Sequence, residues 1–144
     1  MSTHLSGFKK RIHEVCLNQL NERINAVEAS IQDARLSSQN ETKSSAGDKH
    51  ETARAMAHLE IEKNQHSLQQ LIKMRHALNE ISPTLVQTCK GYFYISIALG
   101  KITVESKLVM VISGSAPLGN ELLRAGENES VEVNRVKYSV ISIW

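Results

Sequence analysis

Residues 17–34, LNQLNERINAVEASIQDA, decide the fold of the first half of the chain. Apolar side chains recur here at alternating spacings of four and three residues, at Leu17, Leu20, Ile24, Val27, Ile31 and Ala34. This heptad spacing places one apolar seam along an α-helix and is typical of a coiled coil. No proline interrupts the stretch from residue 4 to about residue 40, so we expect one long helix.

A second helix with a similar stripe is predicted after a polar break. Residues 37–47, SSQNETKSSAG, are rich in serine and end in glycine, which is typical of a loop. The stripe resumes with interruptions at Asn64 and Arg75, and its apolar members are Ala57, Ile61, Leu68, Leu71, Ile72 and Leu78. Pro83 predicts the end of the helix near Ile81. Two such helices bury their seams by lying antiparallel, which predicts a coiled-coil hairpin over residues 1–81 with its tip near 41–50.

The period changes after Leu85, and residues 82–144 are predicted to form a small β-rich domain. Residues 91–100 are β-prone, strands are indicated over 101–105 and 107–112, and a closing pair over 130–133 and 137–143. Gly100-Lys101 is expected to be a hairpin turn, and Pro117 opens a short helix over 117–124. Residues 126–129 form a turn. The predicted fold class is therefore α+β, with a helical hairpin followed by a β-rich domain.

Composition and charge narrow the functional classes. The chain has 144 residues with 41% apolar and only 4% aromatic residues, which suits a long helical element with a narrow seam. The 17 basic and 15 acidic residues leave a net charge of +2, and the run Lys9-Lys10-Arg11 is too short for the basic stripe of a duplex-binding protein.

Cysteine usage and hydropathy bear on the compartment. Cys16 and Cys89 stand far apart, in neither a disulfide framework nor a zinc spacing, so two reduced thiols are expected. The first residues lack the apolar core of a signal peptide, and no apolar run approaches the roughly 20 residues of a membrane span. We expect a soluble, cytoplasmic protein without a membrane partner.

The candidate chemistry lies at the predicted tip, in residues 47–53, GDKHETA. One interpretation is structural, with Asp48 as the N-cap of the second helix and Glu51 as its capping-box partner. The other is functional, with both carboxylates as oxygen ligands for Mg²⁺, which proteins often hold with one or two carboxylates plus phosphate oxygens. Such a pair cannot complete a metal site alone, but it could complete one supplied by a partner.

Two sets of motifs resemble the Gre family of bacterial transcript-cleavage factors. That family carries a tip motif Gly-Asp-x-x-Glu-x-Ala, matched by Gly47, Asp48, Glu51 and Ala53. Its C-terminal domain carries a Ser-Pro-Leu-Gly motif, a Leu-Leu pair and a Gly-Asp-Glu-Val-Glu-Val pattern. Residues 116–119 read APLG, Leu122-Leu123 follow, and residues 128–133 read NESVEV, all at matching spacing. The resemblance covers roughly residues 10–144.

The resemblance implies a fold and a mechanism. The C-terminal domain would be of FKBP-like type and would dock through Pro117, Leu118 and Gly119 at the rim of the secondary channel of bacterial RNA polymerase. The hairpin would enter the channel as a monomer. Asp48 and Glu51 would then help to hold a second Mg²⁺ and a water at the polymerase active site, where backtracked RNA is cleaved by a two-metal mechanism. The chain would bind no cofactor alone and would not be an enzyme itself.

Departures from the family pattern keep two other hypotheses open. Arg54-Ala55 replaces the family's Glu-Tyr, Ala116 replaces the serine, and Asn128 replaces a glycine, which Asn tolerates because it adopts left-handed geometry. The protein could bind the secondary channel and inhibit or regulate polymerase without stimulating cleavage. It could also be a coiled-coil interaction module in which the tip acids only cap a helix.

Overall fold

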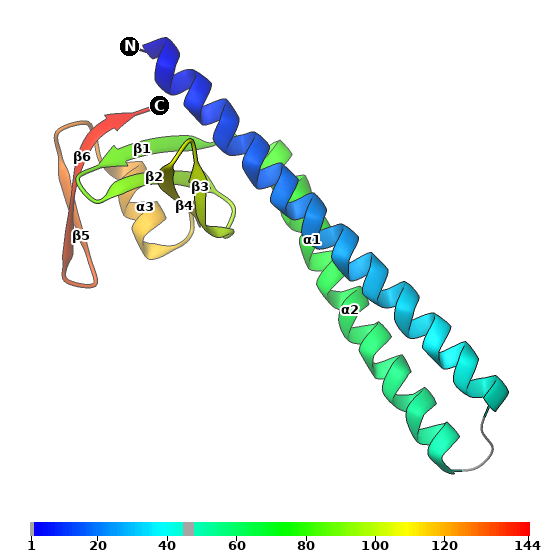
Figure 1. Ribbon diagram of the computed structural model, residues 1–144. Coiled ribbons are helices and arrows are strands. Elements are labelled where there is room, and N and C mark those ends of the chain that lie inside the picture. The colour runs from blue at the N-terminus through cyan, green and yellow to red at the C-terminus, as the bar shows by residue number, and fades with distance from the viewer. Residues whose placement is uncertain (1, 45–47) are drawn as a thin grey trace. The chain divides into compact units, whose positions relative to one another are not determined.

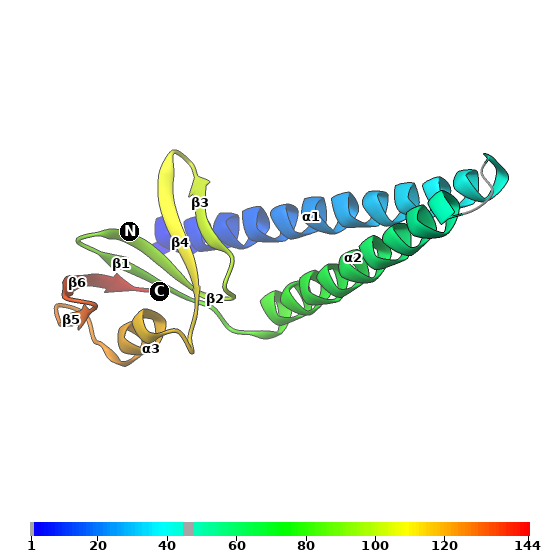
Figure 2. The same ribbon diagram turned by 90° about the horizontal axis from the view of Figure 1, so that it is seen from below.

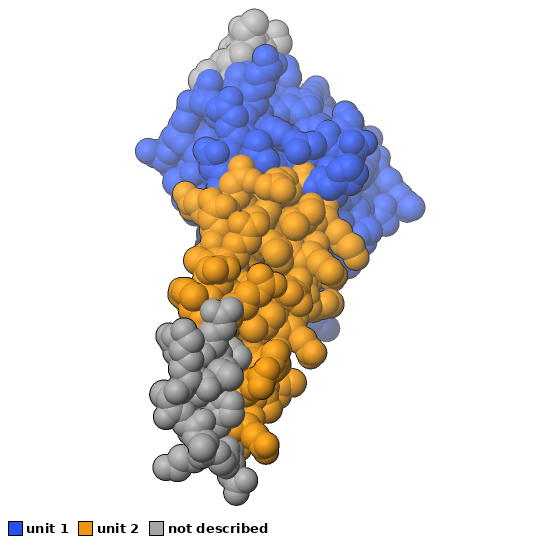
Figure 3. All heavy atoms as spheres, turned by 90° about the vertical axis from the view of Figure 1, so that its right-hand side faces the viewer, with its two compact units in different colours: residues 1–18, 76–144 blue, residues 19–75 orange. Residues whose placement is uncertain are grey.

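The computed structural model describes residues 2–44 and 48–144, with side chains described for residues 6–37 and 51–144. Two long helices, α1 (Ser2–Ser44) and α2 (Asp48–Glu80), precede a six-stranded mixed sheet (Figure 1). This confirms the predicted α+β class. The chain forms two compact units, one of residues 1–18 and 76–144 and one of residues 19–75, which are coloured separately in Figure 3. We call them the sheet unit and the hairpin unit.

The hairpin unit consists of the antiparallel segments of α1 and α2 that lie side by side in Figures 1 and 2. The predicted seam of α1 faces the partner helix, because Ile24, Ile31 and Ala34 are buried and Val27 is half-buried. Polar residues near the seam also pair across the hairpin, where Arg75 Nη1 donates a hydrogen bond of 2.9 Å to Asn21 Oδ1. The coiled-coil pattern therefore predicted the buried face of α1 correctly.

The seam of α2 differs from the predicted one at Ile72 and keeps its two predicted polar interruptions. Ile72 is 41% exposed and lies outside the seam, whereas Asn64 and Arg75 are half-buried, like the apolar seam residues Ala57, Ile61, Leu68 and Leu71. The half-buried positions keep spacings of four and three residues through Asn64 and Arg75. The two polar residues are therefore members of the heptad seam, because helical geometry places them there whatever their polarity.

The sheet unit is built on strands β1 (Thr84–Thr88), β2 (Gly91–Ser96), β3 (Gly100–Val104), β4 (Lys107–Ser113), β5 (Ser130–Val133) and β6 (Val136–Ile143). Their order is β3-β4-β2-β1-β6-β5, and helix α3 (Pro117–Arg124) links β4 to β5. Only the β2–β4 pair is parallel. The carboxyl ends of β2 and β4 therefore lie at the same edge of the sheet.

Helices pack on both faces of this sheet. On one face Val86, Phe93 and Ile95 pack in a cluster with Leu122 and Ala125 from the region of α3. On the other face the start of α1 packs against the sheet, where the rings of Phe8 and Tyr92 meet edge to face at 5.1 Å. Arg11 of α1 also forms an ion pair with Glu105. The sheet unit is therefore a three-layer arrangement with α1 and α3 on opposite faces (Figure 2).

Two sequence-based boundaries need correction. The predicted loop over residues 37–47 is wrong in its first part, because α1 continues to Ser44. The predicted hairpin turn at Gly100-Lys101 is also wrong, since Gly100 begins β3 and β4 lies between β2 and β3. The hairpin turn falls at Glu105-Ser106, where both residues have positive φ, as in two-residue turns that match the twist of the strands.

Other predicted features agree with the structure. Asn128 adopts a left-handed conformation with φ of 68°, as expected for the residue at the family's glycine position. Among the helices of the described residues, none has both the length and the apolarity to cross a membrane. The division into domains at residues 81 and 82 stays a prediction.

Candidate functional site

The predicted tip acids stand in the first turn of α2. Asp48 is the first residue of this helix, and its side chain lies outside the described residues, as do Gly47 and its backbone. Glu51 is exposed three residues later. Residues three apart on a helix share one face, so the two positions are neighbours at this end of the helix. The capping-box interpretation of Asp48 stays a prediction, because it depends on that side chain.

The residues after Glu51 separate a packed position from exposed ones. Ala53 is half-buried and opens the seam pattern of α2, while Arg54 and Ala55 are exposed. Arg54 stands three residues after Glu51, on the same side of the helix. Arg54 therefore places a cation beside the candidate metal ligand, at the surface.

The donor set at the tip fits only part of a Mg²⁺ site. Mg²⁺ prefers six oxygen ligands in octahedral geometry, and two carboxylates supply a minority of them. No group of three or more His, Cys, Asp or Glu side chains placed to hold a metal occurs within the described part of the chain. Glu51 is nevertheless an exposed oxygen donor that a partner's metal could reach.

The second predicted site, Pro117 to Gly119, begins helix α3, and its residues differ in accessibility. Pro117 occupies the first helical turn, where its missing N–H costs no hydrogen bond, and it is exposed. Leu118 is partly buried against the core cluster. Gly119 is buried, and a Cβ placed on it would lie 2.1 Å from the carbonyl oxygen of Ser113. Of the three, Pro117 is available to a partner, while Gly119 allows α3 to approach β4.

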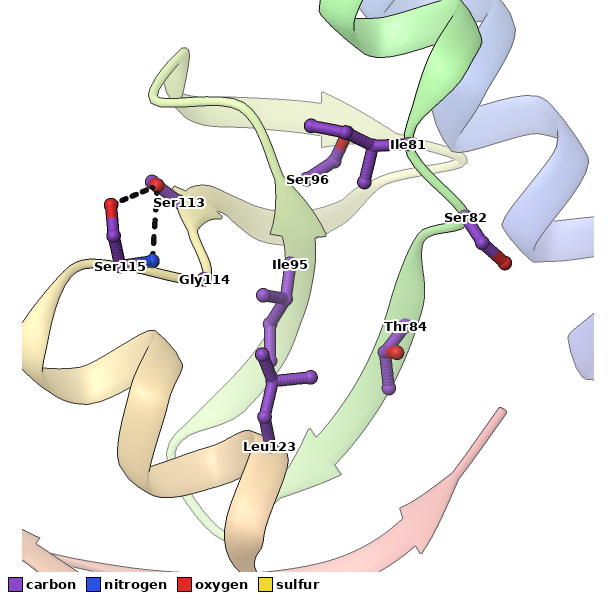
Figure 4. A pocket seen from close by; sticks show the side chains of 9 residues that line it. All are labelled: Ile81, Ser82, Thr84, Ile95, Ser96, Ser113, Gly114, Ser115 and Leu123. Atoms are coloured by element: carbon purple, nitrogen blue, oxygen red, sulfur yellow. Dashed lines mark hydrogen bonds between the residues drawn. The ribbon is translucent and has the colours of Figure 1, made fainter.

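Figure 4 shows a pocket beside the start of α3 that the sequence did not predict. It has a volume of about 290 Å³ and is lined by residues from the linker before β1, from β1, from β2, from the end of β4, from the loop after β4 and from α3. The lining residues are Ile81, Ser82, Thr84, Ile95, Ser96, Ser113, Gly114, Ser115 and Leu123. None of them is charged, so the pocket suits a neutral group with an apolar part.

Hydroxyl groups dominate the polar part of this pocket. Ser113 Oγ lies 2.8 Å from Ser115 Oγ and accepts a hydrogen bond of 3.2 Å from the backbone N–H of Ser115. Ser96 pairs with Ser113 across the parallel β2–β4 ladder, and its buried Oγ has no hydrogen-bond partner among the described residues. An unpaired buried hydroxyl is costly, at about 1–3 kcal/mol, so Ser96 is a candidate for bonding to a docked group. No local motif signals this pocket, because the parallel pairing brings its residues together.

Among the described side chains, clear pKa shifts occur at Cys16, Cys89 and Tyr94. Burial raises the pKa of the Cys16 thiol to about 11. Burial is also the main cause that raises the pKa of Tyr94, and the charge of the nearby Cys16 is the second cause. The exposed Cys89 has a lowered pKa, chiefly because the backbone N–H of Ser139 donates to its sulfur. Cys16 and Tyr94 are therefore neutral core groups at physiological pH.

Comparisons with protein-family models, with curated proteins and with solved structures find no match to this chain.

Proposed function

We propose that this protein is a Gre-like elongation factor that binds bacterial RNA polymerase and stimulates the cleavage of backtracked RNA. The observation that carries the proposal is the exposed Glu51 in the first turn of α2, three residues after Asp48 and next to the end of a long helical hairpin. At about 1.5 Å per residue, the 33 residues of α2 span about 50 Å. A hairpin of this length can carry acids into a channel that excludes a globular domain.

The tip acids would act by completing a metal site in the partner. Asp48 and Glu51 would contribute carboxylate oxygens, and polymerase carboxylates and RNA phosphate oxygens would supply the remaining ligands. Mg²⁺ held in this way would activate a water or stabilise the leaving oxygen. The chain would therefore have no cleavage activity alone and would depend on the polymerase for chemistry.

The sheet unit would provide the docking surface. Pro117 is exposed at the start of α3, and the neutral pocket of about 290 Å³ is formed partly by the loop that precedes it. Leu123 is 48% exposed and lines the same pocket. An apolar patch with an unpaired hydroxyl, that of Ser96, suits a protein side chain better than a nucleic-acid backbone, which basic residues would be expected to bind.

A second function, binding the secondary channel without stimulating cleavage, is favoured by Arg54. This exposed cation stands on the same helix side as Glu51, where the family carries an acid. A guanidinium there would compete with Mg²⁺ for the carboxylate and would turn the factor into an inhibitor or regulator. The third hypothesis, a coiled-coil interaction module, requires no polymerase at all.

The test is RNA cleavage in a stalled, backtracked elongation complex from the cognate bacterium, in Mg²⁺, with and without the full chain. We expect faster cleavage, and we expect Asp48→Asn and Glu51→Gln each to lower the stimulated rate by about 10²-fold or more while polymerase binding survives. Glu60→Gln is the matched control, since Glu60 is an exposed acid farther along α2. It should leave the stimulation unchanged.

The alternatives give different results in the same assay. Binding without acceleration, with slower cleavage when an authentic cleavage factor is added, would support the regulator. In that case Arg54→Glu should restore stimulation. Absence of polymerase binding would refute both polymerase hypotheses and leave the interaction module.

A further inference from the structure

A second pocket in the sheet unit gathers basic side chains that the proposed function does not use. It has a volume of about 270 Å³ and is lined by Ser6, Lys9, Lys10, His13, Pro83 and Tyr94. Ser6, Lys9, Lys10 and His13 follow one another on α1 at spacings of three, one and three residues, which places them on one side of the helix. Pro83 and Tyr94 close the pocket from the linker before β1 and from β2.

The hydrogen bonds in this pocket hold its polar groups in place. Lys9 Nζ donates to the main-chain oxygen of Trp144 at 3.1 Å, which leaves further N–H bonds on the same ammonium group. The hydroxyl of Tyr94, a fully buried residue, lies 3.4 Å from His13 Nδ1. Burial raises the pKa of Tyr94, so this hydroxyl keeps its proton at neutral pH and can donate. Lys10 and Ser6 are exposed at the rim.

The described side chains that line the pocket include two lysines and no acid. No carboxylate is among the described side chains that line it, and Glu105, which lies on a loop of the same unit, is paired with Arg11. Lys9 and Lys10 therefore place two positive charges around one cavity. Repulsion between like charges is relieved when an anion enters between them.

We propose that this pocket binds the phosphate group of a small soluble phosphate monoester. A phosphate monoester carries a charge near −2 at neutral pH and three acceptor oxygens, which matches two ammonium groups together with hydroxyl and imidazole donors. A water molecule occupies about 30 Å³ of liquid volume, so a cavity of about 270 Å³ holds more than a bare phosphate. The additional room, bounded by Pro83 and the lysine stems, accommodates a small organic group.

The test is an NMR titration of the full chain that follows the ring signals of His13. The probes are inorganic phosphate and glycerol 3-phosphate, with sodium chloride adjusted to hold the ionic strength constant and glycerol as the uncharged control. The pH is kept at about 8, where phosphate monoesters are dianions because their second pKa is about 6. We expect saturable shifts with both phosphates, tighter binding of glycerol 3-phosphate, and no shift with glycerol.

Two variants separate a built site from diffuse attraction. Lys10→Gln removes an exposed side chain of the pocket and should weaken binding by roughly tenfold, as expected for a lost charge-assisted hydrogen bond. Lys101→Gln removes an exposed lysine on β3 that does not line the pocket, and it should leave the affinity unchanged. Linear, unsaturated shifts up to tens of millimolar phosphate, or equal weakening in both variants, would overturn the proposal. Neither result depends on polymerase, so this test is independent of the proposed function.

Discussion

The sheet unit and the hairpin unit bury their apolar residues in different ways. In the sheet unit, Phe8, Tyr94 and Leu122 are at most 1% exposed, because helices pack on both faces of the sheet. In the hairpin unit only two helices meet, and every described seam position of α2 from Ala53 to Arg75 is half-buried. A third layer creates interior positions that a two-helix seam cannot provide. Stability should therefore reside mainly in the sheet unit.

Phe8→Ala should show the largest effect, because it removes an aromatic ring from the three-layer core. We expect a loss of about 3–5 kcal/mol in the free energy of unfolding. Urea unfolding followed by the fluorescence of Trp144, the single tryptophan, and by helical circular dichroism measures it. Leu36→Ala, at a 49% exposed position of the hairpin unit, is the control and should cost less than about 0.5 kcal/mol. Similar losses in both variants would contradict the contrast between the units.

Gly119→Ala should be destabilising although alanine is the better helix former. Its Cβ would meet the carbonyl oxygen of Ser113 at 2.1 Å, so α3 would have to move away from β4. We expect a loss of about 2–3 kcal/mol, against a propensity gain of about 1 kcal/mol for Gly to Ala on an exposed helix surface. The control is Asn120→Ala, an exposed neighbour on α3 that should be neutral or slightly stabilising. A more stable Gly119→Ala protein would show that the close approach is unimportant.

Ile31→Ala and Ile72→Ala compare seam and surface within the hairpin unit. Ile31 is 6% exposed, and its replacement should lower the free energy of unfolding by about 2 kcal/mol. Ile72 is 41% exposed, and its replacement should lower it by less than about 0.5 kcal/mol. The same urea unfolding, read by circular dichroism, measures both. An equal cost at Ile72 would mean that another surface covers this side of α2 in solution.

The smallest expected effect is an alkaline loss of stability caused by Cys16. Its pKa is raised by burial from 9.0 to about 11, so the unfolded chain releases this proton at lower pH than the folded chain does. Cys16 therefore leaves the free energy of unfolding unchanged below about pH 9. As the pH rises from about 9 to about 11, this free energy decreases, and the loss is about 1 kcal/mol at pH 10. Cys16→Ala should flatten this part of the pH profile relative to Cys89→Ala, the exposed matched control. Parallel profiles would refute the assignment to Cys16.

The sequence predicted the seam of α1 well and that of α2 only in part. In α1 the heptad residues are all apolar, so pattern and packing coincide. In α2 the polar residues Asn64 and Arg75 occupy seam positions, as predicted, whereas the apolar Ile72 was wrongly assigned to the seam. Helical geometry decides which side faces the partner, and one hydrogen bond, from Arg75 to Asn21, accommodates a charged residue there.

The candidate sites also differ in whether the sequence alone could predict them. The tip acids are three residues apart on one helix, so their proximity could be predicted from spacing alone. The two pockets could not, because each joins residues from separate elements, such as Ser96 with Ser113 and His13 with Tyr94. Gly119 differs from both. Its motif predicted a residue that contacts a partner, whereas the structure shows that it allows α3 to pack closely against Ser113.

The sequence by itself determined the two helices, the change to short strands and the position of the acids next to the tip. These features depend on local periodicity, which the order of residues states directly. Only the tertiary structure decided the strand order, the parallel β2–β4 pair and the use of the first turns of α1 as a cover for the sheet. They depend on pairings between distant residues, whose free energies come from burial and backbone hydrogen bonds that no local pattern encodes.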